Sequence, residues 1–159
     1  MIHRTDRRIR LCITLLVLNL IVIWGNSLLP GSVSGAFSQW VRDLIAALIP
    51  GASPNSQAGH GLLRKLAHFT EFCCLGIGFS YLVRMIRTRQ VEFYVLPLLG
   101  GFLAACVDET IQRFVPGRGP SVTDVGIDTA GAALGIVLLS FAYVINKRRN
   151  TIDAKETQK

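Results

Sequence analysis

Ionisable side chains that could do chemistry fall inside or beside strongly apolar stretches of this chain. The candidates for acid–base work are His68, Glu71, Asp108 and Glu109. Histidine exchanges a proton near neutral pH, and Glu71 shares a helical stripe with His68 and could orient its ring. Asp108 and Glu109 could act as a base or bind a divalent cation. Ionisable groups are costly in a bilayer, so the default expectation is a functional site.

A second set of polar residues is suited to holding an anionic ligand. Arg118 lies on a Gly-flanked turn just before a helix N-terminus, where a phosphate or carboxylate is favoured. The residues expected to bind ligand are Lys65, Gln112, Arg118, Ser121, Asp124 and Asp128. One histidine with scattered acids lacks the spacing of a dedicated metal site, so none is predicted, and any cofactor stays unknown.

The elements that position these residues are apolar and helical. Half of the 159 residues are hydrophobic, and the mean hydropathy is +0.43. The net charge of +7 could suggest nucleic acid, but the basic clusters flank apolar runs, as in membrane proteins. The cysteines lie within apolar runs, with no CxxC spacing, and support neither a disulfide framework nor a zinc site.

Four apolar runs are long enough to span a bilayer, at 11–29, 62–86, 93 to about 115, and 121–145. A cleavable signal peptide competes for the first run, but its length favours a retained helix. We therefore predict an all-α, polytopic membrane protein with four transmembrane helices. The membrane domain is 11–145, preceded by a basic segment at 1–10 and followed by a polar tail at 146–159, of which 150–159 is expected to be disordered.

Between the first two runs, the loop at 30–61 contains a short amphipathic helix that is expected to lie at the interface. Its apolar face comprises Phe37, Trp40, Val41, Leu44, Ile45 and Leu48, and its polar face Ser38, Gln39, Arg42 and Asp43. The larger group of basic residues should be cytoplasmic, which places both termini on the cytoplasmic side of the plasma membrane and residues 30–61 and 114–120 on the outside.

Helical rise places three ionisable residues at one depth. His68, Asp108 and Asp128 each lie about 10 Å inside the outer end of a helix, so they should share an outer-leaflet pocket. Gly131 and Gly135 form a GxxxG pair for close helix packing on the same stripe as Asp128. The alternative is that ion pairs of Lys65 or Arg118 with Asp108 and Asp124 only fix helix register. Asn19 and Asn26 are expected to form interhelical hydrogen bonds.

These motifs resemble the VanZ-like family of bacterial membrane proteins over roughly residues 10–145. The resemblance rests on KLAHFTEF at 65–72, DETIQRFVPGRGPSVTDVGID at 108–128, and the two glycines that follow. The matching positions are Lys65, His68, Glu71, Phe72, Asp108, Glu109, Gln112, Phe114, Gly117, Arg118, Ser121, Asp124 and Gly131. Asp128 departs from the pattern, where Asn is more common. The resemblance implies a link to teicoplanin-type resistance or a housekeeping role in the cell envelope.

The leading hypothesis is a pocket that binds, and could modify, an anionic amphiphile: a lipid-linked wall precursor, a phospholipid headgroup or a lipoglycopeptide. The alternative is a non-enzymatic accessory protein whose charges lock the bundle. A small ion conductor is disfavoured because the inner half lacks polar residues to complete a path. Whether the chain is an enzyme stays open, and its expected partners are membrane lipids and such a ligand, with no nucleic acid.

Overall fold

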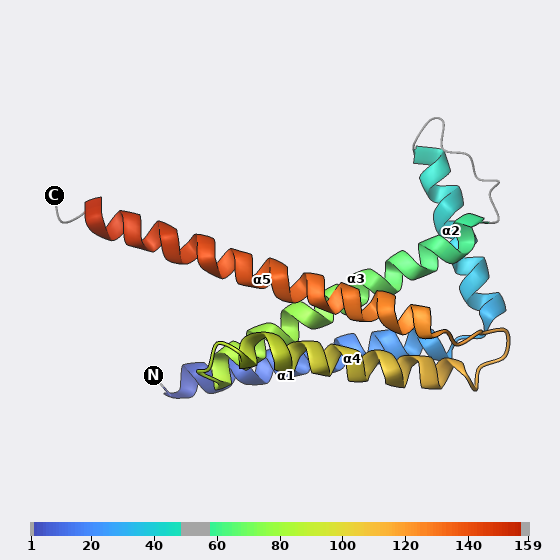
Figure 1. The fold of residues 1–159 in the computed structure, drawn as a ribbon. Coiled ribbons are helices and arrows are strands. Elements are labelled where there is room, and N and C mark those ends of the chain that lie inside the picture. Colours follow the sequence, from blue (N-terminus) through green and yellow to red (C-terminus); the bar gives the residue numbers. More distant parts are fainter. Residues whose placement is uncertain (1, 49–57, 157–159) are drawn as a thin grey trace.

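The chain folds as five helices and, over the part that the structure describes, no strands. The computed structural model describes the backbone of residues 2–48 and 58–156, with side chains over 6–36, 38–41, 43–44 and 61–151. The helices are α1 (Ile2–Leu28), α2 (Gly31–Leu48), α3 (Ala58–Ile86), α4 (Glu92–Gln112) and α5 (Val122–Glu156). The predicted all-α class is thus confirmed (Figure 1).

Four of these helices are long and apolar enough to cross a membrane. Their apolar stretches are Asp6–Leu28, Gly61–Ile86, Glu92–Gln112 and Val122–Thr151. Large apolar side chains cover their outer surfaces, such as Leu11 and Val137, which are 60% and 59% exposed. A protein surrounded by water rarely exposes so large an apolar surface, whereas a protein surrounded by lipid normally does. The chain is therefore a multi-pass membrane protein.

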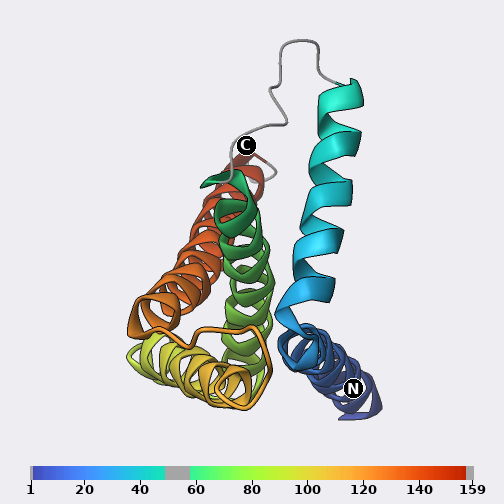
Figure 2. The same cartoon turned by 90° about the vertical axis from the view of Figure 1, so that its right-hand side faces the viewer.

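The helix α3 is the centre of the bundle, because it contacts each of the other four helices. In Figure 1, α1 and α4 run along one side of it, and α5 crosses it at an angle. Figure 2 shows α2 standing beside α3 and away from α4 and α5. The end of α1, the start of α3 and the α4–α5 turn meet at one end of the bundle, which we call the polar end.

Small residues let α3 and α5 approach closely. A Cβ atom added at Gly131 would lie 2.4 Å from the carbonyl oxygen of Phe69, and one at Gly135 would lie 2.1 Å from that of Cys73. No side chain fits in that space. The predicted packing role of this glycine pair is confirmed, and the contact fixes which face of α5 points at α3.

Several helix boundaries differ from the predicted ones: α1 begins at Ile2 and α3 at Ala58, ahead of the predicted runs, and three further differences follow. The helix between the first two spans begins at Gly31, directly after α1, and Ser38 on its predicted polar face is buried. The helix α4 ends at Gln112, because the chain then turns toward Pro116 with bonds such as Val115 N–H to Gln112 C=O. Residues 150–156 are helical, not disordered, since the segment after Ile145 contains no Gly or Pro to end α5.

Candidate functional site

The turn between α4 and α5 docks on the junction of α1 and α2. The N–H of Gly31 donates to the carbonyl oxygen of Pro116 at 3.1 Å. Gly117 has a φ of +74°, a left-handed conformation that glycine adopts without strain. A Cβ at Gly31 would lie 2.1 Å from the carbonyl oxygen of Gly117, so only glycine fits there. This contact holds the turn over the polar end.

Arg118 on this turn binds the C-terminal end of α1. Its Nε donates to the carbonyl oxygen of Leu29 at 3.0 Å, and its Nη2 donates to that of Asn26 at 2.7 Å. A cation at these unpaired carbonyls also suits the negative end of the helix dipole. The Nη1 atom is buried without a hydrogen-bond partner among the described residues. Arg118 therefore has one guanidinium nitrogen left for a ligand.

Desolvation lowers the pKa of the Arg118 guanidinium from its ordinary value, and the nearby charge of Arg64 lowers it further. The ordinary value is so high that the group is still charged at neutral pH. The turn therefore brings a permanent positive charge to the polar end.

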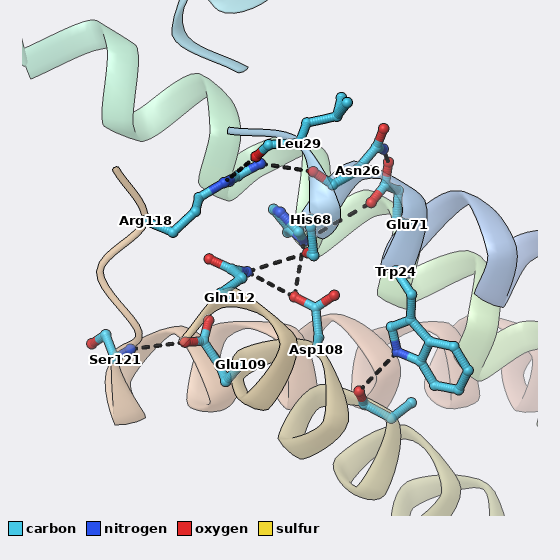
Figure 3. A network of polar contacts seen from close by, with 12 residues as sticks. Trp24, Asn26, Leu29, His68, Glu71, Asp108, Glu109, Gln112, Arg118 and Ser121 are labelled. Carbon is cyan, nitrogen blue, oxygen red and sulfur yellow. Dashed lines mark hydrogen bonds and ion pairs between the residues drawn. The ribbon is translucent and has the colours of Figure 1, made fainter. Parts of the chain in front are cut away.

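His68 lies at the centre of the polar end, as Figure 3 shows. Its Nδ1 atom is 3.9 Å from Oε2 of Glu71 and 3.8 Å from Oδ2 of Asp108. Both distances exceed hydrogen-bond length, and Nδ1 has no partner among the described residues. His68 is only 9% exposed. The expected meeting of His68 and Asp108 is confirmed, while their chemical roles stay predictions.

Asp108 is held in place from one side. It is fully buried, and its Oδ2 accepts a 2.8 Å hydrogen bond from Nε2 of Gln112, which also donates to Oγ of Ser27 at 3.3 Å. The other oxygen, Oδ1, is buried with no partner among the described residues. The bond confirms that Asp108 and Gln112 share a helix face, and it makes Gln112 an orienting group.

Glu71 is anchored across the α1–α3 interface. Nδ2 of Asn26 donates to its Oε1 at 2.7 Å, so the interhelical role predicted for Asn26 is confirmed. Its Oε2, the oxygen that faces His68, is buried without a hydrogen bond among the described residues. Oδ1 of Asn19 is also buried without a hydrogen bond among the described residues, so the interhelical bond predicted for Asn19 is not observed there. Glu71 is thus placed to orient His68 but does not bond it here.

Glu109 and Ser121 fix the start of α5. The Ser121 N–H donates to Oε2 of Glu109 at 2.8 Å, and Oγ of Ser121 accepts from the Thr123 N–H at 3.2 Å. Ser121 is therefore the N-cap that the sequence predicted. Oε1 of Glu109 is buried and lacks a partner among the described residues. Glu109 therefore has a structural role in holding the start of α5, and its predicted catalytic role stays a prediction.

Lys65 and Asp124 form an ion pair of 2.6 Å between α3 and α5. Their side chains are 37% and 16% exposed. Pairing of this kind is what the register-fixing alternative predicted for Lys65. The ammonium group is occupied by Asp124 and can reach an anionic ligand only by sharing that partner.

Asp128 completes the centre of the site from α5. It is 3% exposed. His68, Asp108 and Asp128 each offer one ligand atom, and these three atoms lie within 4.8 Å of one another, so this group could hold a metal ion. The three residues come from three different helices, so no local spacing in the sequence could indicate such a site.

A cavity of about 430 Å³ opens beside this cluster, between α1, α2, α3 and the turn. Its polar lining includes Arg64, His68, Glu71 and Arg118, and its apolar lining includes Leu29, Val33, Val41, Leu63 and Ala67. Ser38 lines it too, and neither Ser38 nor Arg64 was among the predicted site residues. Arg64 is four residues before His68, and that spacing alone could have placed it on the same face.

Comparison with known proteins gives one family match. The family described as VanZ/LLP1 matches residues 11–143, which include all five helices in whole or in part and every residue of the site. Searches of curated proteins and of solved structures each give no match. The matched range agrees with the resemblance seen in the motifs.

Proposed function

The chain belongs to the VanZ/LLP1 family, and on that premise we propose that its polar end binds the headgroup of an anionic amphiphile in the outer leaflet of the plasma membrane. The orientation follows from the basic residues around the opposite end of the bundle. The proposed ligands share one chemistry: each has a phosphate or carboxylate headgroup on an apolar chain.

The cavity beside His68 is the observation that carries this proposal. Its volume of about 430 Å³ lies within the range of small-molecule pockets. Its lining combines the positive charges of Arg64 and Arg118 with apolar side chains such as Leu29, Val33 and Leu63. An amphiphile combines the same two chemistries, so its headgroup can pair with the arginines and the start of its chain can contact the apolar side chains.

Native mass spectrometry of the detergent-purified protein tests the binding directly. We expect phosphatidylglycerol to bind in preference to zwitterionic phosphatidylcholine. Arg64→Gln should reduce that binding on the order of tenfold, because a hydrogen bond to a charged group is lost. Arg113→Gln is the matched control, since Arg113 is exposed on the same end and does not line this cavity. Equal binding of both lipids, or equal loss in both variants, would reject the proposal.

The family resemblance adds a cellular expectation. When the chain is expressed in a teicoplanin-sensitive bacterium, we expect teicoplanin tolerance to increase. His68→Ala and Asp108→Asn should accumulate in the membrane normally and abolish that increase. Membrane accumulation is measured by immunoblot beside the susceptibility assay, so that a folding defect is told apart from a lost site.

The second candidate is a non-enzymatic accessory protein, and two contacts favour it. Lys65 is paired with Asp124, and Glu109 holds the start of α5 through Ser121. Both contacts join helices and need no ligand. If His68→Ala and Asp108→Asn fail to accumulate, while Arg64→Gln retains wild-type lipid binding, this candidate replaces the first.

A further inference from the structure

Three ligand-type side chains converge at the polar end from three helices. His68 on α3, Asp108 on α4 and Asp128 on α5 offer atoms that lie within 4.8 Å of one another. All three residues are at least nine-tenths buried. The donor set is one imidazole nitrogen and two carboxylate oxygens.

Some of the polar atoms of these three groups lack hydrogen-bond partners. Nδ1 of His68 and Oδ1 of Asp108 are buried without a hydrogen bond among the described residues. Among the described side chains, Asp128 forms no ion pair; the salt bridges found there are those of Lys65 with Asp124 and of His68 with Glu71 and Asp108. A buried polar atom without a partner is rare and needs an explanation.

Lys65 and Arg118 are engaged elsewhere, and Arg64, which is also nearby, forms no ion pair with Asp108 or Asp128 among the described residues. Lys65 is bound to Asp124, and Arg118 donates to the carbonyl oxygens at the end of α1. Two buried carboxylates without a paired cation are strongly unfavourable in a membrane protein. A divalent cation would neutralise both, leaving no net charge within the cluster.

We propose that His68, Asp108 and Asp128 bind one divalent transition-metal ion of the zinc or manganese class. A mixed imidazole and carboxylate set suits these ions, whereas calcium and magnesium prefer oxygen ligands alone. A small cavity of about 10 Å³ beside this group, lined in part by His68 and Asp128 but not by Asp108, has room for roughly one water-sized particle. The site thus has ligands, charge and space for a single ion.

Binding requires the ligand atoms to move closer. Around zinc, ligand atoms at about 2.1 Å from the ion lie about 3.4 Å apart, which is closer than the upper limit of 4.8 Å found here. Small side-chain rotations of Asp108 and Asp128 cover that difference. Gln112 already orients one oxygen of Asp108, as outer partners of metal ligands do. Three protein ligands leave further positions of the ion open to water or to an anionic oxygen.

Metal binding is measured on the full chain, purified in detergent without a polyhistidine tag, stripped with chelator and given no added lipid. Mn²⁺ is the first probe, followed by electron paramagnetic resonance, because manganese is little attracted to the chain's free cysteines. Zn²⁺ is the second probe and is counted by elemental mass spectrometry. We expect about one ion of either metal per chain.

The variants His68→Gln, Asp108→Asn and Asp128→Asn should each weaken binding by at least about tenfold. Asp124→Asn is the matched control: it removes a carboxylate one turn away on the same helix that is paired with Lys65, and it should keep its ion. Wild-type protein that takes up no Mn²⁺ and no Zn²⁺, or ligand variants that bind as well as Asp124→Asn does, would overturn the proposal.

Folding of the variants does not limit the test, because the wild type alone gives a second readout. Co²⁺ added to the stripped wild type should show visible absorption bands of a nitrogen- and oxygen-ligated ion, and it should raise the thermal unfolding temperature. Absence of both effects overturns the site. Since no lipid is present, the result is independent of the amphiphile proposal: metal binding can fail while phosphatidylglycerol binding holds, and the reverse.

Discussion

Nδ1 of His68 on α3 lies 3.8 Å from Oδ2 of Asp108 on α4. Neither this ring nitrogen nor the other carboxylate oxygen, Oδ1, has a hydrogen-bond partner among the described residues. The distance is too long for a direct hydrogen bond and short enough for a bridging atom. The two residues also line the polar end from opposite helices. Their spacing connects the fold to both proposals, the cation and the anionic headgroup.

Asp128→Asn should change stability in opposite directions with and without metal. In chelator-stripped protein, removing a buried carboxylate without a described partner should stabilise the fold by about 1–3 kcal/mol. In protein saturated with Mn²⁺, the variant should be less stable than the wild type, because it cannot gain the binding free energy. Thermal unfolding in detergent under the two conditions measures this. A variant that is less stable than the wild type in stripped protein would contradict it.

The α3–α5 contact should not accept a methyl group at Gly135. A Cβ there would lie 2.1 Å from a backbone oxygen of Cys73, and backbone cannot rotate away, so Gly135→Ala should cost about 1–3 kcal/mol. Gly126→Ala on the same helix is the control. Its Cβ would meet nothing within 4 Å, and alanine should gain up to about 1 kcal/mol of helix propensity. If both variants unfold at the same temperature, the close approach is wrong.

The ion pair of Lys65 with Asp124 should show coupling in a double-mutant cycle. Lys65→Ala, Asp124→Ala and the double variant should give a coupling free energy of about 0.5–1 kcal/mol, because Lys65 is 37% exposed and solvent weakens the pair. Unfolding is measured by thermal denaturation in detergent. Coupling near zero would free Lys65 for the ligand role that the sequence suggested.

Arg118→Lys should loosen the end of α1 even though the charge is retained. Lysine cannot reproduce two hydrogen bonds from one planar group to the carbonyls of Asn26 and Leu29, so we expect a loss of about 1–2 kcal/mol. Hydrogen exchange should increase in peptides that cover 26–31. The exposed Arg113→Lys on the same turn should leave exchange there unchanged. Equal exchange in both variants would show that the capping contact is absent.

Features that depend on helical periodicity could be predicted from the sequence. The GxxxG pair at Gly131 and Gly135, the shared face of Asp108 and Gln112, and the Ser121 cap all follow from spacing along one helix, and the structure confirms each. The common depth of His68, Asp108 and Asp128 also follows from helical rise, and it is one condition for the three residues to meet.

The sequence could not predict what depends on how helices rotate against one another. Nothing local shows that Arg118 reaches the carbonyls of α1, or that Lys65 chooses Asp124. The meeting of His68, Asp108 and Asp128 likewise depends on tertiary packing. The three residues lie far apart in the sequence, so no metal-ligand spacing could reveal it. The burial of Ser38 depends on the angle at which α2 leaves α1.

The most direct test of the central claim is an experimental structure of the protein in nanodiscs that contain phosphatidylglycerol and Mn²⁺. We predict density for an ion among His68, Asp108 and Asp128, and density for a headgroup beside Arg64 and the free nitrogen of Arg118. A structure in which His68 points into the bilayer, away from Asp108 and Asp128, with lipid headgroups bound elsewhere, would contradict the account.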